Sequence, residues 1–173
     1  MKKFLQFSGI IAAVLALVGF ILLIACHGIV GVDDPAGNWY SAGAVLFGNG
    51  PAKVTAFWVF TGTFNGQASG AALVAWIFSL VALLALIAGA VLPLLKVKVS
   101  GKAAGLVNLC AVFLMITAGI LVFFTVPSWM GNNGYNGNGW GLSAGYVIAA
   151  ILYIVSGAIA ICPAVVDFLG KKK

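Results

Sequence analysis

Four long apolar segments dominate the pattern of hydrophobic and polar positions along this chain. They cover residues 4–26, 71–95, 103–126 and 142–166, and none of them contains an acidic or basic residue. At a rise of about 1.5 Å per residue, each segment is long enough as a helix to cross a hydrocarbon core of about 30 Å. The pattern therefore predicts an all-α membrane protein, in which residues 1–173 form a single domain built on a four-transmembrane-helix bundle.

The amount and placement of charge agree with that prediction. Only 7% of the 173 residues are charged and 63% are hydrophobic, whereas a soluble domain carries about 25% charged residues. Eight of the nine lysines lie at the two chain ends or in the short loop 96–102. By the positive-inside rule, both termini and this loop are expected in the cytoplasm, with loops 27–70 and 127–141 outside a plasma or bacterial inner membrane. The basic charge then indicates orientation and contact with membrane lipids, and it does not favour a nucleic-acid partner.

The first apolar segment has a second interpretation, as a secretory signal. Its sequence Leu23-Ile24-Ala25-Cys26 is similar to a bacterial lipobox, in which the cysteine is lipidated after cleavage. However, the segment is longer than the apolar region of about 7–15 residues that a signal peptide carries. We therefore expect an uncleaved first helix, and lipidation of Cys26 stays open.

The connection between the first two segments carries turn and strand signals. The stretches 42–47 and 53–60 flank the turn sequence Gly48-Asn49-Gly50-Pro51, which is the pattern of a β-hairpin. A second turn signal, Asn65-Gly66, would add another short strand. We expect a small extracytoplasmic β-hairpin or sheet in this loop, lying over the outer ends of the helices with its aromatic face toward the bundle or the lipid. An irregular glycine-rich loop is the alternative.

Aromatic residues are concentrated in both outer loops. In the second loop, Trp129 and Trp140 stand where helices leave the membrane, as an interfacial aromatic belt predicts, whereas Tyr135 at the tip is not explained in that way. We favour interfacial anchoring with flexible turns, and a glycan- or partner-binding loop is the alternative. The candidate interaction residues of the two loops are Trp39, Phe57, Trp58, Trp129, Tyr135 and Trp140.

Small residues in the apolar segments are candidates for helix packing. Gly101 and Gly105 open the third segment, and Gly141 and Gly145 open the fourth. This small-x-x-x-small spacing allows two helix backbones to approach closely in lipid. We expect the glycines to pack the four helices of one chain, or to mediate association between chains.

Polar residues inside the segments are few. Thr117 and Ser156 fall near the middle of the membrane and could meet, but we expect each hydroxyl to bond the carbonyl four residues earlier in its own helix. Asn108 is expected to point into the bundle and to join helices. The alternative is an oligomeric channel or transport component, with a pore lined by these residues and by glycines.

Catalytic and metal-binding side chains are scarce. The chain has no arginine, no glutamate and one histidine, so neither a carboxylate acid–base pair nor a hydrolase triad is predicted, and no cofactor is expected. His27, Asp33 and Asp34 form a weak candidate for a divalent-cation cluster, because a metal site needs three or four ligands. Cys26 has no cysteine partner on the outer side, so no structural disulfide is predicted there.

The order and lengths of the loops form a characteristic layout. A long β-prone outer loop with Trp39 and Phe57-Trp58 is followed by a short basic inner turn and a shorter second outer loop. This layout resembles the claudin-type four-helix membrane proteins, and the resemblance implies the same topology over the whole chain. In that family a Gly-Leu-Trp motif precedes two outer-loop cysteines, whereas this chain has Ala56-Phe57-Trp58 followed by Thr61.

The absence of a catalytic set, together with small-residue helix faces and aromatic loops, predicts a function in assembly. We expect a non-enzymatic structural or accessory subunit. It would associate with itself as a homo-oligomer, or with other membrane-protein subunits, through those helix faces and the aromatic-rich outer loop.

Overall fold

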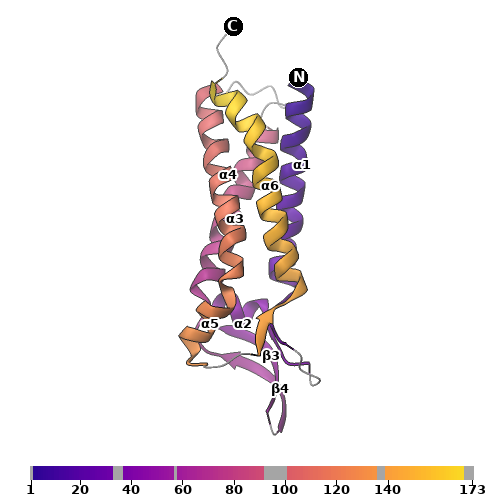
Figure 1. Ribbon diagram of the computed structural model, residues 1–173, viewed down its shortest axis with the longest axis vertical. Coiled ribbons are helices and arrows are strands. Elements are labelled where there is room, and N and C mark those ends of the chain that lie inside the picture. The colour runs from indigo at the N-terminus through magenta and orange to yellow at the C-terminus, as the bar shows by residue number, and fades with distance from the viewer. Residues whose placement is uncertain (1, 33–36, 57, 92–100, 136–138, 170–173) are drawn as a thin grey trace.

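Four long helices lie side by side, and a small sheet with two short helices packs against one end of them (Figure 1). The short helices are α2 (Ala42–Phe47) and α5 (Thr125–Asn133). This is a computed structural model, and the residues that it describes are 2–32, 37–56, 58–91, 101–135 and 139–169.

The four long helices contain the apolar segments of the sequence. They are α1 (Lys2–Ala25), α3 (Gly70–Val91), α4 (Gly101–Phe123) and α6 (Ala144–Leu169). The parts long and apolar enough to cross a membrane are Phe7–Ala25, Gly70–Val91, Ala103–Phe123 and Ala144–Val166. Four candidate membrane-spanning helices are therefore confirmed, although residues 92–95 of the second predicted segment lie outside the described residues.

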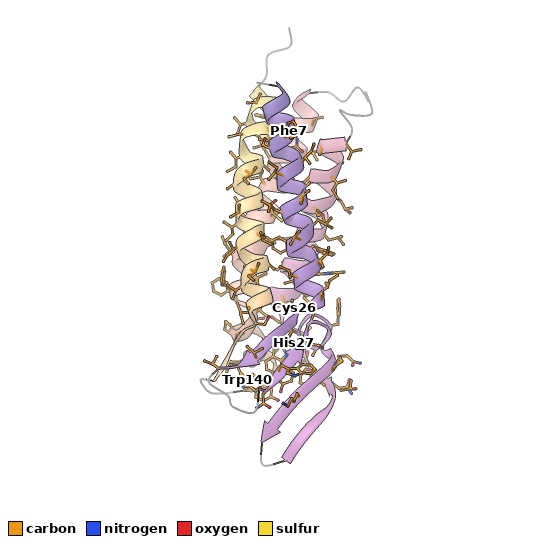
Figure 2. All side chains as sticks on the ribbon, turned by 90° about the vertical axis from the view of Figure 1, so that its right-hand side faces the viewer. Phe7, Cys26, His27 and Trp140 are labelled. Atoms are coloured by element: carbon orange, nitrogen blue, oxygen red, sulfur yellow. The ribbon has the colours of Figure 1, made fainter. Side chains whose placement is uncertain are left out.

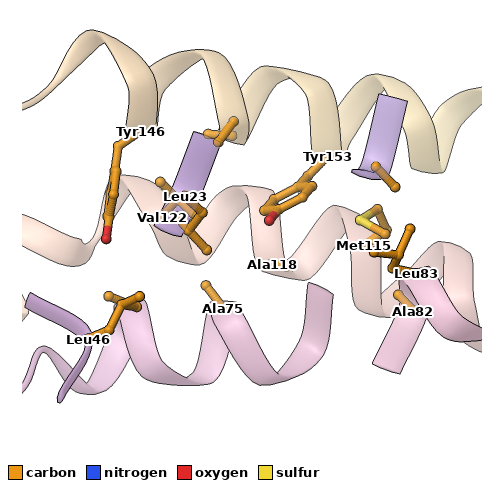
Figure 3. Packing of buried hydrophobic residues seen from close by; sticks show 14 of the residues in the cluster. Leu23, Leu46, Ala75, Ala82, Leu83, Met115, Ala118, Val122, Tyr146 and Tyr153 are labelled. Carbon is orange, nitrogen blue, oxygen red and sulfur yellow. The ribbon is translucent and has the colours of Figure 1, made fainter. Parts of the chain in front are cut away.

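The helices pack as a closed bundle with a core of small side chains. Helix α6 contacts α1 and α4, while α3 contacts the same two helices from the other side. Tyr146 and Tyr153 of α6 are fully buried, and Figure 3 shows them directed into the bundle, with Ala118 and Val122 of α4 nearby. Large apolar side chains instead lie on the outer surface of the bundle, such as Phe113, which is 68% exposed. The bundle thus has an extensive apolar exterior.

The sheet has five antiparallel strands in the order β4-β3-β2-β1-β5. A small antiparallel sheet is thus confirmed, and it joins both predicted outer loops. Ile29 of β1 pairs with Leu142 of β5, which comes from the second loop. The strands are β1 (His27–Gly31), β2 (Trp39–Ser41), β3 (Asn49–Ala56), β4 (Trp58–Asn65) and β5 (Trp140–Leu142).

The β-hairpin lies at a different place from the one predicted. The stretch Ala42–Phe47 is helix α2, because the Ser41 hydroxyl accepts a hydrogen bond from Ala44 N at 3.2 Å and Gly48 ends the helix at φ 73°. The observed hairpin is β3–β4, with residue 57 between the two strands. Residues 61–64, expected as a further short strand before the turn at Asn65-Gly66, are strand and belong to β4, which ends at Asn65; the next element is α3.

The second predicted outer loop contains an ordered helix, α5, where flexible turns were expected. Asn133 explains this order: its side chain accepts a hydrogen bond from Gln67 N at 2.8 Å and donates to Gln67 O at 2.9 Å. Asn132 donates to Ala68 O at 2.8 Å. Side-chain amides thus satisfy backbone groups before α3 and attach α5 to that segment.

Two serines cap the N-termini of long helices and also join these helices to other elements. The Ser69 hydroxyl accepts a bond from the first turn of α3 and donates to Thr125 O at 3.0 Å. The Ser143 hydroxyl accepts a bond from the first turn of α6 and donates to His27 O. Each N-cap therefore connects the bundle to the elements that form its sheet-bearing end.

Candidate functional site

The buried face of the sheet carries an aromatic cluster. Its central residue is Trp129 of α5, which is 0% exposed. The Trp129 ring centroid lies 4.5 Å from that of Tyr40 and 5.5 Å from that of Phe64. Tyr135 stacks on Trp129 at 5.1 Å with an interplanar angle of 14°, and Trp140 lies 6.4 Å away. Because these residues come from β2, β4, β5 and the α5 region, the cluster holds the two connections together.

A hydrogen bond between phenols reinforces this cluster. Tyr40 Oη and Tyr135 Oη are 3.3 Å apart, although the two residues are 95 positions apart in the chain. Burial raises the pKa of the Tyr40 phenol well above its ordinary value, and the hydrogen bond and the proximity of Tyr135 raise that pKa further. The cluster therefore keeps Tyr40 protonated at a pH above about 10, where an ordinary tyrosine ionises.

The interfacial-belt interpretation of Trp129 is wrong. A belt residue would lie at the membrane surface, whereas helix α5 turns the Trp129 side chain into the protein, and its Nε1 has no hydrogen-bond partner among the described residues. Trp140 is half-buried in the same cluster, and Tyr135 belongs to the cluster because its ring stacks on Trp129. Tyr40 and Phe64 could not be identified from local sequence, because their partners are distant in the chain and only the strand pairing brings them together.

The opposite face of the sheet borders a cleft. Trp39 stacks on His27 at a centroid distance of 4.2 Å and an interplanar angle of 22°. Both side chains line a cleft of about 380 Å³ where α1 meets the sheet. Figure 2 shows Cys26 and His27 at this junction, at the sheet end of α1. The remaining lining residues are Ile24, Ala25, Cys26, Ser41, Ala42, Gly43, Asn49, Gly50 and Pro51.

The other predicted loop residues are only partly described. Asp33, Asp34 and Phe57 lie outside the described residues. Trp58 begins β4 at the hairpin turn. Within the described part of the chain, no group of three or more His, Cys, Asp or Glu side chains comes close enough to hold a metal ion. The candidate cation cluster of His27, Asp33 and Asp34 stays a prediction, because two of its three residues lie outside the described residues.

The predicted glycines have separate positions. Gly101 begins α4 and Gly105 is buried in that helix. Gly145 lies against the side chain of Cys26, the residue between α1 and β1. Gly141 belongs to strand β5 and lies against Val32, so Gly141 and Gly145 do not form a stripe on one helix.

The close contacts between helices use glycines other than the predicted ones. A Cβ atom on Gly119 of α4 would lie 2.8 Å from Ala150 O of α6, and one on Gly157 of α6 would lie 2.6 Å from Ile116 of α4. A Cβ atom on Gly19 of α1 would lie 2.9 Å from the ring of Tyr153 of α6. The small-x-x-x-small spacing could not identify these positions, because it describes one helix alone. Each of these glycines is required by a side chain or a carbonyl of a neighbouring helix.

The three polar residues proposed for packing or a pore lie in different contacts. The Ser156 hydroxyl donates to Ala12 O of α1 at 2.8 Å, so the expected bond to its own helix is wrong. Asn108 fits against Gly89 of α3, where a Cβ would lie 2.5 Å from its Oδ1. Thr117 is half-buried in α4. Ser156 and Asn108 therefore join different helix pairs, α6 with α1 and α4 with α3.

No protein-family model matches this chain, and a search of curated proteins also finds no match. The likeness to claudin-type proteins therefore stays a prediction from the layout of the chain.

Proposed function

We propose that this protein is a non-enzymatic integral membrane protein that associates with a second copy of itself through the edge strand β4. In this proposal it is a structural or accessory subunit with the claudin-like layout. The single observation that carries the proposal is the unprotected outer edge of its sheet.

The proposed orientation places the sheet outside the membrane. Helix α1 begins and α6 ends at the end of the bundle opposite the sheet (Figure 1). In the sequence, eight lysines lie next to the helix ends that are at this end of the bundle. Lys53, the ninth, belongs to the sheet. This asymmetry supports cytoplasmic termini by the positive-inside rule.

Strand β4 pairs with β3 over its whole length, from Asn49↔Asn65 to Ala56↔Trp58. On its other side, no strand among the described residues pairs with it. Soluble and membrane proteins usually protect such an edge with charged residues, proline, a bulge or a very short strand. The eight residues of β4 include no charged residue and no proline, whereas β5, at the other edge of the sheet, has only three residues. The long edge is therefore suited to pairing with another strand.

The register identifies which backbone groups face outward from β4. Pro51 of β3 is paired with Thr63 of β4, and proline has no N–H with which to bond its partner. In an antiparallel ladder, such a non-hydrogen-bonded pair alternates with hydrogen-bonded pairs. The N–H and C=O of Thr63 therefore point away from β3 toward the open edge, and those of Gly62 point toward β3.

A proline at position 63 tests the proposal. Thr63→Pro removes an outward N–H and leaves the bonds between β3 and β4 in place, and Thr63→Val is the matched control that keeps this N–H. Photobleaching steps of single fluorescent copies are counted in phosphatidylcholine bilayers. We expect two steps for the native chain and for Thr63→Val, and one step for Thr63→Pro.

Thermal unfolding of both variants serves as the folding control, because the Thr63 side chain is exposed. Single steps for all three proteins would reject self-association. Two steps for Thr63→Pro with an intact fold would show that copies associate through another surface, such as the helix faces.

A further inference from the structure

The cleft between α1 and the sheet has the lining of a ligand site. Its volume of about 380 Å³ falls within the range of about 300–1,000 Å³ that is typical of small-molecule sites. One wall is the last turn of α1, with Ile24 and Ala25, and the other walls come from β1, β2, α2 and β3. The cleft thus has an apolar side toward the bundle and a polar side toward the sheet.

The polar side supplies hydrogen-bond donors. The Ser41 hydroxyl accepts from Ala44 N at 3.2 Å, so its own proton is available to donate. The His27 imidazole and the Asn49 amide also carry N–H groups, and none of the described residues that line the cleft is acidic. A donor-rich wall favours a ligand with several acceptor oxygens.

A cation lies on the same face of the sheet. Lys53 of β3 is directly opposite Trp39 of β2, and directly opposite residues of an antiparallel pair lie on the same face. Pro51, two residues before Lys53, lines the cleft itself. Lys53 therefore lies on the face of the sheet that borders the cleft, and a cation at this place favours an anionic ligand such as a phosphate.

The apolar surface of α1 leads directly into this cleft. Exposed side chains follow one another along α1 at spacings of three and four residues, which places them on one face of the helix. The last of them, Ile24, is 47% exposed and belongs to the cleft wall. The members of this stripe are Ile10, Val14, Leu17, Ile21 and Ile24.

We infer that the cleft binds the phosphate-bearing headgroup of an anionic phospholipid, whose acyl chain lies along this stripe of α1. His27, Ser41, Asn49 and Lys53 contact the headgroup, and the Trp39 ring covers it. The continuity between a donor-rich cleft and an apolar stripe selects a lipid over a free anion, because only an amphiphile uses both surfaces. The inference rests on the membrane placement of the bundle and is independent of pairing through β4.

A cysteine in the cleft wall provides the probe. Replacing the exposed Cys110 and Cys162 with alanine leaves Cys26 as the only thiol. The full chain is placed in phosphatidylcholine nanodiscs, and the rate of Cys26 alkylation by an uncharged maleimide is measured. Phosphatidylglycerol is added in one arm, diacylglycerol with the same acyl chains in a second, and inorganic phosphate in a third.

We expect phosphatidylglycerol to slow Cys26 alkylation, and diacylglycerol and inorganic phosphate to leave it unchanged. The combined variant His27→Ala and Lys53→Gln should raise the lipid concentration for half-maximal protection about tenfold, which corresponds to about 1.4 kcal/mol. Lys53→Arg should retain the protection. A chain with its single cysteine moved to position 65, on β4, controls for effects of the lipid on the reagent.

Equal protection by inorganic phosphate would overturn the lipid assignment, and no protection by phosphatidylglycerol would overturn the site. The same measurement in the Thr63→Pro background separates the two proposals. Protection of Cys26 should persist there, whether or not copies pair through β4.

Discussion

Replacing Trp129 with alanine should strongly destabilise the sheet-bearing end of the bundle. Trp129 is 0% exposed, and its ring lies between 4.5 and 6.4 Å, centroid to centroid, from Tyr40, Phe64, Tyr135 and Trp140. Truncation of a buried tryptophan costs about 3–5 kcal/mol, since the removed contacts and the remaining cavity both contribute. We therefore expect the free energy of unfolding of Trp129→Ala to fall by about that amount.

The assay is reversible unfolding of the full chain in mixed micelles by a denaturing detergent, together with amide hydrogen exchange. Trp39→Ala is the matched control, because Trp39 belongs to the same sheet but is only half-buried and, among the described residues, stacks on His27 alone. Its loss should cost about 1 kcal/mol. Exchange should accelerate in α5 and β5 of Trp129→Ala and stay slow in the middle of α4 and α6. Equal losses for the two variants would refute the conclusion that Trp129 is the centre of the cluster.

Three other substitutions test separate parts of the structure. Gly119→Val should weaken the contact between α4 and α6, because its Cβ would approach Ala150 O to 2.8 Å; an overpacking cost of about 1–3 kcal/mol is expected in the same unfolding assay, and no change would contradict the close helix approach. Ser143→Ala removes the α6 cap and the bond to His27 O, and should cost about 1–2 kcal/mol, with faster hydrogen exchange at the start of α6 as the local readout. The raised pKa of Tyr40 means that an unfolded tyrosine ionises from about pH 10 while the folded one stays protonated, so stability should fall as pH rises above that value. Tyr40→Phe should lose less stability between about pH 9 and 11 than the native chain does, and identical slopes would contradict the shift.

The long helices could be predicted because length and the absence of charge determine them. A segment of about 20 apolar residues has few alternatives to a membrane-crossing helix. Short segments lack this constraint, and a six-residue apolar stretch fits a strand or a helix equally well by pattern. The stretch Ala42–Phe47 is a helix because of the residues at its ends, Ser41 as the N-cap and Gly48 in the left-handed region. Both residues could have been recognised in the sequence as helix signals.

The sheet and the aromatic cluster could be predicted only in part. Turn and strand signals indicated β-structure in the first loop, but the three residues of β5 are too few to carry a pattern, and their pairing with β1 spans more than a hundred positions. Trp129 follows directly after an apolar segment, so its position in the sequence indicated the membrane surface. Its burial depends on Asn133, whose bonds to Gln67 attach α5 to the segment before α3, and such a long-range contact leaves no local signal.

Cross-linking between two copies probes their association through β4 at individual residues. In a chain whose native cysteines are replaced by alanine, single cysteines are introduced on β4 as Thr61→Cys or Thr63→Cys, and as Ile148→Cys on the exposed surface of α6. Paired strands bring side chains within about 4.5–5.5 Å of each other, close enough for a disulfide after small adjustments. Mild oxidation in phosphatidylcholine vesicles should yield a disulfide-linked dimer from at least one β4 position and none from Ile148→Cys. The absence of dimer at both β4 positions, or equal dimer formation at Ile148→Cys, would contradict the proposed pairing.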